Sequence, residues 1–181
     1  MGAPHDIEAR GPRMTVFDVV VGLGANLGDR QTTLEAASVA LERLGRVVGR
    51  SRLYDTEPVG PPQPRYLNAA VRLVCALEPR VLLGELHGIE QRAGRERRER
   101  WGPRVLDLDI LWVAGLVLDG EDLVIPHPEL TNRAFALMPL LDVAPEAVSP
   151  SGVRYRDVSM GLDHSGVRVM AAAHGNWPAC G

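Results

Sequence analysis

The segment VLDLDILWV constrains the fold of this chain more than any other stretch. Apolar residues alternate with aspartates in its first half, which is typical of a β-strand that packs one face against a hydrophobic core. Asp107 and Asp109 should therefore point to one side of a sheet, while Leu106, Leu108 and Ile110 point to the other. The fold consequently needs a sheet that carries two carboxylates side by side on one face.

Glycines and prolines divide the rest of the chain into further strands and helices. The patterns predict strands at residues 16–24, 47–54 and 66–77, one helix that ends at Gly45 and another over residues 79–94. After the aspartate segment, an Asp-Gly turn signal predicts a hairpin, and short helical turns punctuated by prolines follow it. This order predicts an α+β fold of the ferredoxin-like kind, a mostly antiparallel sheet with helices packed on one main side.

The length of 181 residues fits a single domain. We expect this domain at residues 14–160, with a disordered N-terminal tail at 1–13 and a flexible C-terminal tail at 161–181, because neither end shows apolar periodicity. No apolar run is long enough to span a bilayer, and the first residues lack the hydrophobic region of a secretory signal. We therefore expect a cytoplasmic protein whose Cys75 and Cys180 are reduced thiols.

The charged residues narrow the possible functions. All 20 basic residues are arginines and the net charge is −3, which argues against a general nucleic-acid binder. Without lysine the chain cannot complete a Walker A phosphate loop, and the glycines of GLGANLGDR also lack Rossmann spacing. We interpret Gly22, Gly24 and Gly28 as residues that shape a strand-to-helix turn, with Asn26 or Asp29 as the helix cap.

The aspartate pair suggests a metal site. Two like charges held close together are unfavourable unless a cation neutralises them, and ligand sets made only of oxygen favour Mg²⁺. An ordinary solvated sheet face would show the same alternation. The spacing of Asp107 and Asp109 leaves both interpretations open until a partner group is found.

A cationic segment lies immediately before the aspartates. It contains Arg92, Arg95, Arg97, Arg98, Arg100 and Arg104, and glycines at positions 94 and 102 bracket most of it. Such a segment could close over a nucleotide and neutralise its phosphates, although a solvated loop partly neutralised by Glu96 and Glu99 explains the composition equally well. Its position directly before a carboxylate pair favours phosphoryl transfer, which requires cationic donors and a metal together.

Three further features have both a structural and a functional interpretation. The proline-rich segment DTEPVGPPQPR is a connector or the preshaped wall of a ligand pocket. His127, between two prolines, is a structural residue or a phosphate contact held by a rigid backbone. Trp101 is a core residue or a partly exposed ring that stacks on a planar heterocycle.

Four motifs together carry a family resemblance: YDTEPVG, YLNAAV, ERWGPRVLDLDI and IPHPELTNRAFALMPL. The chain resembles the 6-hydroxymethyl-7,8-dihydropterin pyrophosphokinases of folate synthesis over approximately residues 16–146. The resemblance implies a ferredoxin-like fold and transfer of the β,γ-pyrophosphoryl group of ATP to the pterin hydroxymethyl oxygen, leaving AMP. It also implies a pair of Mg²⁺ ions, with ATP and the pterin as small-molecule partners. We expect a monomer with neither nucleic acid nor membrane as a partner.

The resemblance also implies residue roles at the matching positions. Asp107 and Asp109 would hold the ions, and Arg95 and Arg104 would be the catalytic arginines. The nucleotide would be bound by Glu90, Gln91, Arg97, Arg98, Arg100, Ile110, His127 and Arg133. The pterin would be bound by Thr56, Pro58, Val59, Tyr66, Asn68, Trp101 and Phe135.

Two other functions fit parts of the sequence. Another metal-dependent phosphotransferase or nucleotidyltransferase would share the carboxylates and arginines but release ADP or pyrophosphate. A non-catalytic RNA-binding module would use the arginine segment alone, but the net negative charge speaks against it.

Overall fold

An antiparallel sheet of six strands forms the centre of the protein. The computed structural model describes residues 15–94, 103–170 and 177. Five strands follow the order β5-β1-β4-β3-β8, β2 also pairs with β4, and every pairing is antiparallel. The strands are β1 (Phe17–Ala25), β2 (Arg46–Arg50), β3 (Tyr54–Thr56), β4 (Tyr66–Cys75), β5 (Asp107–Val113) and β8 (Val167–Val169).

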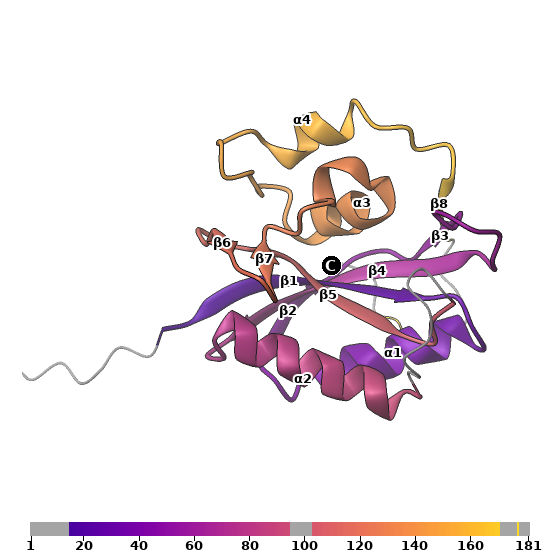
Figure 1. The fold of residues 1–181 in the computed structure, drawn as a ribbon, viewed down its shortest axis with the longest axis horizontal. Coiled ribbons are helices and arrows are strands. Elements are labelled where there is room, and N and C mark those ends of the chain that lie inside the picture. The colour runs from indigo at the N-terminus through magenta and orange to yellow at the C-terminus, as the bar shows by residue number, and fades with distance from the viewer. Residues whose placement is uncertain (1–14, 95–102, 171–176, 178–181) are drawn as a thin grey trace, which may run out of the picture.

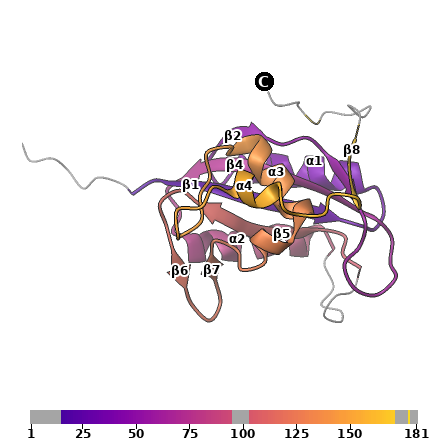
Figure 2. The same ribbon diagram turned by 90° about the horizontal axis from the view of Figure 1, so that it is seen from above.

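Helices cover both faces of this sheet (Figures 1 and 2). One face carries α1 (Arg30–Leu41) and α2 (Pro79–Arg92), and the other carries α3 (Ala134–Val143) and α4 (Tyr155–Ser159). A short 3₁₀ helix, η1 (Leu130–Asn132), precedes α3, and β6 (Leu118–Asp119) pairs with β7 (Val124–Ile125) in the predicted hairpin. The predicted α+β class with a mostly antiparallel sheet is confirmed.

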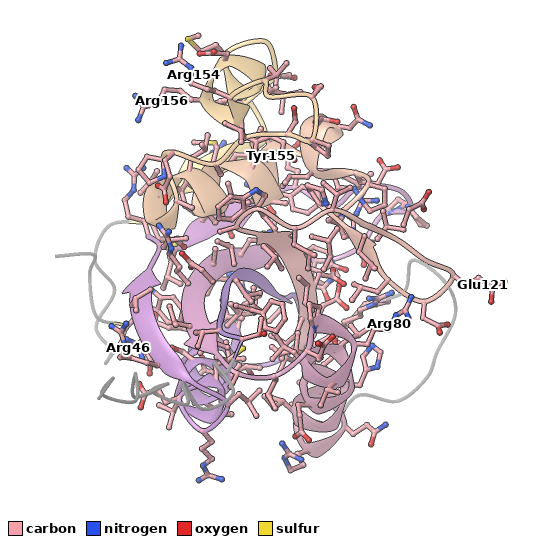
Figure 3. The ribbon with its side chains drawn as sticks, turned by 90° about the vertical axis from the view of Figure 1, so that its left-hand side faces the viewer. Arg46, Arg80, Glu121, Arg154, Tyr155 and Arg156 are labelled. Carbon is pink, nitrogen blue, oxygen red and sulfur yellow. The ribbon has the colours of Figure 1, made fainter. Side chains whose placement is uncertain are left out.

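Each face of the sheet has its own hydrophobic core. Leu34 of α1 and Leu86 of α2 belong to one buried cluster, and Leu137 of α3 and Tyr155 of α4 belong to the other. Tyr155 points from α4 into the molecule, whereas its neighbours Arg154 and Arg156 point outward (Figure 3). The prediction of helices on one main side was wrong, because AFALMPLLDV forms one apolar helix despite its internal Pro139.

The central strand β1 is buried on both faces. Val19, Val21 and Leu23 belong to the core under α1 and α2, whereas Val20 belongs to the core under α3. Such double burial explains the almost continuous apolar run in this part of the sequence. The strand therefore has neighbours on both edges and both faces, which makes it a rigid base for a site.

The chain departs from the predicted elements in two places. The predicted strand at residues 47–54 is two strands, β2 and β3, separated by residues 51–53. The sequence predicted a flexible tail from residue 161, whereas the structure pairs Val167–Val169 with β3 as strand β8. None of the helices in the described part of the chain has the length and apolar character needed to traverse a bilayer.

Candidate active site

A cavity of about 300 Å³ lies between the sheet and the start of α3. Its residues come from β1, β3, β4, β5, α3 and the loops next to them, and they are Gly22, Leu23, Gly24, Thr56, Glu57, Val59, Gln63, Tyr66, Asn68, Ala69, Arg104, Asp107, Asp109, Leu111, Arg133, Phe135 and Ala136. The cavity size falls at the lower end of the range for small-molecule sites. Carboxylate and guanidinium groups thus share one space with amide, hydroxyl and aromatic groups.

Two glycines of β1 help to form the floor of this cavity. In the pairing of β1 with β5, Gly22 lies opposite Asp109 and Gly24 lies opposite Asp107. A Cβ atom added at Gly24 would lie 2.9 Å from the Asn68 side-chain oxygen. Our interpretation of Gly22 and Gly24 as turn residues was wrong, because both lie within the strand, where an added Cβ would crowd the side chains of Leu111 and Asn68.

The paired carboxylates of β5 face the cavity as the alternation predicted. Leu108 and Ile110 point into the opposite core, and Asp107 and Asp109 line the cavity. Burial raises the pKa of Asp109, and the negative charge of Asp107 raises it further. The pair lines a pocket, so the alternative of an ordinary solvated sheet face does not describe it.

Arg104 supplies positive charge next to this pair. Its Nη1 donates a hydrogen bond to Oδ1 of Asp107 within a salt bridge. Burial by itself would lower the pKa of Arg104, but the charge and hydrogen bond of Asp107, together with the charge of Asp109, outweigh burial and raise the pKa. The guanidinium group therefore stays charged. It lines the cavity and could neutralise a phosphate group bound there.

His127 lies close enough to the aspartates to interact with them electrostatically. Burial lowers its pKa, and the charge of Asp109 partly opposes this effect. The backbone N–H of Glu129 donates to Nδ1 at 3.2 Å, which assigns the proton of the neutral ring to Nε2. The N–H of His127 donates to the carbonyl of Leu111 at 2.9 Å, so the histidine is fixed relative to β5.

The other part of the cavity has the character of a site for a heterocycle. Nδ2 of Asn68 donates to Oγ1 of Thr56 at 2.7 Å, and both residues are buried. The guanidinium carbon of Arg133 lies 5.8 Å from the centre of the Phe135 ring. An amide and a ring that line the same cavity can bind the edge and the face of a planar ligand.

Asn26 connects this site internally, a role the sequence analysis missed. Its Oδ1 accepts from the N–H of Arg104 at 2.8 Å, and its own N–H donates to the Arg104 carbonyl at 3.1 Å. Its Nδ2 donates to Oε1 of Gln63 and to the carbonyl of Pro64, at 3.1 and 3.2 Å. From the motif GLGANLGDR we predicted Asn26 or Asp29 as a helix cap. Asp29 is the N-cap of α1, and its side chain accepts a hydrogen bond from the N–H of Thr32.

Several of the residues predicted for the nucleotide or the pterin are absent from the cavity lining. Glu90 is 1% exposed and its Oε1 accepts from the N–H of Leu108 at 2.8 Å. The Ile110 side chain belongs to the core, Gln91 is exposed on α2, and Pro58 is half-buried on the proline-rich loop. The predicted residues Arg95, Arg97, Arg98, Arg100 and Trp101 lie outside the described part of the chain.

The aspartates are the strongest candidates for a metal ion. Among the described residues, no three His, Cys, Asp or Glu side chains gather to form a metal-binding group. Mg²⁺ is often held by only one or two carboxylates, with substrate phosphates and water completing the shell. The donor set of Asp107 and Asp109 fits that mode.

Fold and site together define a class of protein. A carboxylate pair and an arginine share one cavity with a polar and aromatic pocket, an arrangement typical of an enzyme that transfers a phosphate-containing group to a small organic molecule. Residues 20–145 match the family described as 7,8-dihydro-6-hydroxymethylpterin-pyrophosphokinase. The chain belongs to this family.

Similar proteins support the assignment. The chain is 40% identical over 158 residues to a 2-amino-4-hydroxy-6-hydroxymethyldihydropteridine pyrophosphokinase of Pseudomonas aeruginosa, covering 86% of this chain and 98% of that one. It is 44% identical over 133 residues to the protein of the same name from Synechocystis, covering 72% and 68%. A mitochondrial folate synthesis bifunctional protein of Arabidopsis thaliana is 43% identical over 143 residues, covering 78% of this chain and 26% of the relative.

Solved structures show the same fold. A crystal structure of an HPPK-DHPS protein in complex with substrates superposes with a TM-score of 0.61 at 15% identity, covering 81% of this chain. A Plasmodium falciparum HPPK-DHPS with pteroate superposes with a TM-score of 0.63 at 16% identity, covering 83%. The chain spans 43% of the length of each of these proteins.

Proposed function

We propose that the cavity beside β5 is the active site for the reaction of this family. The chain transfers the pyrophosphoryl group of ATP to 6-hydroxymethyl-7,8-dihydropterin, which gives the pterin diphosphate and AMP in folate biosynthesis. One observation carries the placement: Asp107, Asp109 and Arg104 line the same cavity as Thr56 and Asn68. Groups suited to bind phosphate and groups suited to bind a pterin thus line one cavity, which could hold both substrates next to each other.

Mg²⁺ is the metal that this site would hold, through Asp107 and Asp109. The raised pKa of Asp109 supports the proposal, because a carboxyl group disfavoured by burial and by a neighbouring charge gains from a cation. When bound, the ions would neutralise the phosphates of ATP and orient them. The number of ions, a pair according to the family resemblance, is part of the proposal.

Arginine and histidine side chains would act on the nucleotide. The pterin hydroxymethyl oxygen would form a bond to the β-phosphorus and lose its proton to water, while the bond between the β-phosphorus and the oxygen that stays on AMP breaks. Arg104 would stabilise the negative charge that passes to the departing AMP. Arg133 and Nε2–H of His127 would donate hydrogen bonds to phosphate oxygens. Arg95 has a catalytic role in the same proposal, and the other predicted nucleotide contacts are Arg97, Arg98, Arg100, Glu90, Gln91 and Ile110.

The pterin would bind between the proline-rich loop and α3. The amide of Asn68 can donate and accept at once, and this matches the alternating donors and acceptors on the edge of a pterin. Phe135 would stack on one face of the ring, and Trp101 is proposed for the same role. The remaining proposed contacts are Thr56, Pro58, Val59 and Tyr66. Burial makes each unmade hydrogen bond cost roughly 1–3 kcal/mol, which would exclude ligands with a different edge.

Product analysis tests the activity. The chain is incubated with ATP, Mg²⁺ and 6-hydroxymethyl-7,8-dihydropterin, and the nucleotides are separated by ion-exchange chromatography. AMP should appear in amounts equal to the pterin diphosphate, without ADP. Formation of ADP or free pyrophosphate would identify a different phosphotransferase, and absence of AMP would contradict the proposal.

We also propose that the enzyme works as a monomer in the cytoplasm. The lining residues of this chain already include groups suited to both proposed substrates, so the proposal invokes no residue of a second copy. Small-molecule substrates explain this cavity without a nucleic-acid or membrane partner. Size-exclusion chromatography with light scattering tests the monomer, and fractionation of the source cells tests the location.

A further inference from the structure

Arg65 is at the end of the proline-rich loop that joins β3 to β4. Glu57, Val59 and Gln63 of this loop line the cavity, whereas Arg65 does not. A loop of this kind needs anchors if its lining residues are to keep one geometry, because ordering flexible residues on binding costs affinity. The contacts of Arg65 provide such anchors.

The guanidinium of Arg65 joins both ends of the loop. Its Nε donates to Oδ2 of Asp55, and its Nη1 donates to Oε1 of Glu57 at 3.0 Å. Its Nη2 donates to the carbonyl of Asp55 at 3.2 Å. Asp55 is also held by Nη1 of Arg30 at 3.0 Å, which ties the same point to α1. Residue 65 is thereby fixed to residues 55 and 57 across the base of the loop.

A third anchor comes from the C-terminal segment. Nη2 of Arg65 donates to the carbonyl of Gly166 at 3.3 Å, and the same carbonyl accepts from the N–H of Glu57 at 3.0 Å. Gly166 directly precedes β8, whose Val167 pairs with Thr56. This segment lies beyond residues 20–145, the part of the chain that matches the family.

Arg65 lies outside the cavity lining and contacts one lining residue, Glu57. Successive side chains of a strand point to opposite faces, so Asp55 points away from the face on which Thr56 meets Asn68. Arg65 reaches Asp55 and is absent from the cavity lining. It therefore acts on a ligand only through the residues that it holds.

We propose that Arg65 is a positioning residue for the pterin and that Gly166 and β8 complete its anchor. This inference rests on the proposed function, since it assigns the loop side of the cavity to the pterin. Arg65 and the C-terminal strand hold Thr56 and Glu57 in the geometry that binds the heterocycle, while the nucleotide side is held separately by β5 and residues 127–133.

The first experiment measures KM for both substrates in Arg65 variants of the full chain. Arg65→Ala should raise KM for the pterin about tenfold, with KM for ATP and kcat changed less than about threefold. Arg65→Lys should recover only part of the loss, because an ammonium group lacks the forked geometry that reaches several acceptors. The wild-type chain in the same assay reports separately whether the proposed reaction occurs at all.

Arg72→Ala is the matched control. Arg72 also bonds two carboxylates, those of Asp18 and Glu146, and a carbonyl group, that of Val143. It lies on β4 outside the cavity lining, so its loss should leave both KM values near wild type. A pterin KM within twofold of wild type in Arg65→Ala would overturn the proposal, as would an equal rise in both KM values.

The second experiment tests the C-terminal anchor. The N–H of Met170 donates to the Leu53 carbonyl, so the N–H of Arg168, two residues earlier, also points toward β3. Arg168→Pro removes both the exposed side chain and this backbone N–H. Arg168→Ala removes the side chain but keeps the N–H. The pterin KM should rise severalfold in the proline variant and stay at the wild-type value in the alanine variant. Equal pterin KM values in the two variants would overturn the role of β8.

Discussion

Two features of its surroundings disfavour the charged form of Asp109. Its carboxyl group is buried and lies near Asp107, and both conditions raise its pKa. A pKa above the value of the unfolded chain means that ionisation of Asp109 weakens the fold at neutral pH. A residue with a stability cost and a place in the cavity is a strong candidate for a function that requires the charge.

Replacement of Asp109 by asparagine should separate activity from stability. Asp109→Asn keeps the shape but removes the negative charge, so kcat should fall by orders of magnitude. The melting temperature without Mg²⁺ should stay equal or rise, because the disfavoured charge is gone. Asp119→Asn, on the exposed β6–β7 hairpin, should change neither quantity. Normal turnover in Asp109→Asn would remove this residue from the metal site.

At the scale of elements, the aspartate strand is fastened to α2 through Glu90. The Glu90 carboxyl group accepts a hydrogen bond from the backbone N–H of Leu108, which lies between Asp107 and Asp109. Glu90→Ala should leave a buried N–H unpaired and lower the free energy of unfolding by roughly 1–3 kcal/mol. Glu90→Gln keeps an acceptor oxygen and should lose less, and urea unfolding of the two variants measures the difference. Equal losses in both would show that the hydrogen bond is not what matters.

A second link between elements depends on pH. Asp142 of α3 accepts from Tyr54 of β3 at 2.7 Å and forms a salt bridge with Arg52. Burial by itself would raise the pKa of Asp142, but the hydrogen bonds from Arg52 and Tyr54 outweigh it and lower the pKa. The charged carboxylate therefore stabilises the fold above the unfolded pKa, and this contribution disappears as the pH falls through the folded pKa.

Asp142→Asn should accordingly show a stability defect that depends on pH. At pH 7 the variant should lose roughly 1–2 kcal/mol of unfolding free energy, because the charge-assisted bonds are replaced by neutral ones. Below about pH 4, near the value of an unfolded aspartate, the difference from wild type should shrink as the wild-type carboxylate is protonated. Urea titrations at several pH values measure this, and a defect that does not vary with pH would contradict the assignment.

The sequence predicted elements better than the contacts between them. The alternation around Asp107 and Asp109 gave the correct faces of β5, because strand periodicity is local. Gly22 and Gly24 were misinterpreted because their role depends on the register with β5, more than 80 residues away. The three residues of β8 carry too little local signal, and only the distant edge of β3 makes them a strand.

At the scale of the whole molecule, the cavity joins parts of the chain that are far apart in sequence. Strand β5, the proline-rich loop and the start of α3 each contribute part of its wall, and Asn26 links Arg104 to Gln63 and Pro64 beneath it. No single segment of the described chain contains all of the lining residues. The same arrangement gives the two substrates different walls of one cavity.

Ligand-induced stabilisation should therefore divide into two parts that respond to different mutations. A nonhydrolysable ATP analogue at about 100 times its Kd should stabilise the wild-type chain by roughly 2.7 kcal/mol with Mg²⁺, and far less with EDTA. Addition of the pterin should raise the melting temperature further.

Asn68→Ala should lose the pterin increment and keep the nucleotide increment, because its amide lies on the pterin side. The double variant Asp107→Asn/Asp109→Asn should lose the Mg²⁺-dependent nucleotide increment. Loss of both increments in Asn68→Ala would show that the two sides of the cavity are not separate, since ligands stabilise a fold only through the sites they occupy.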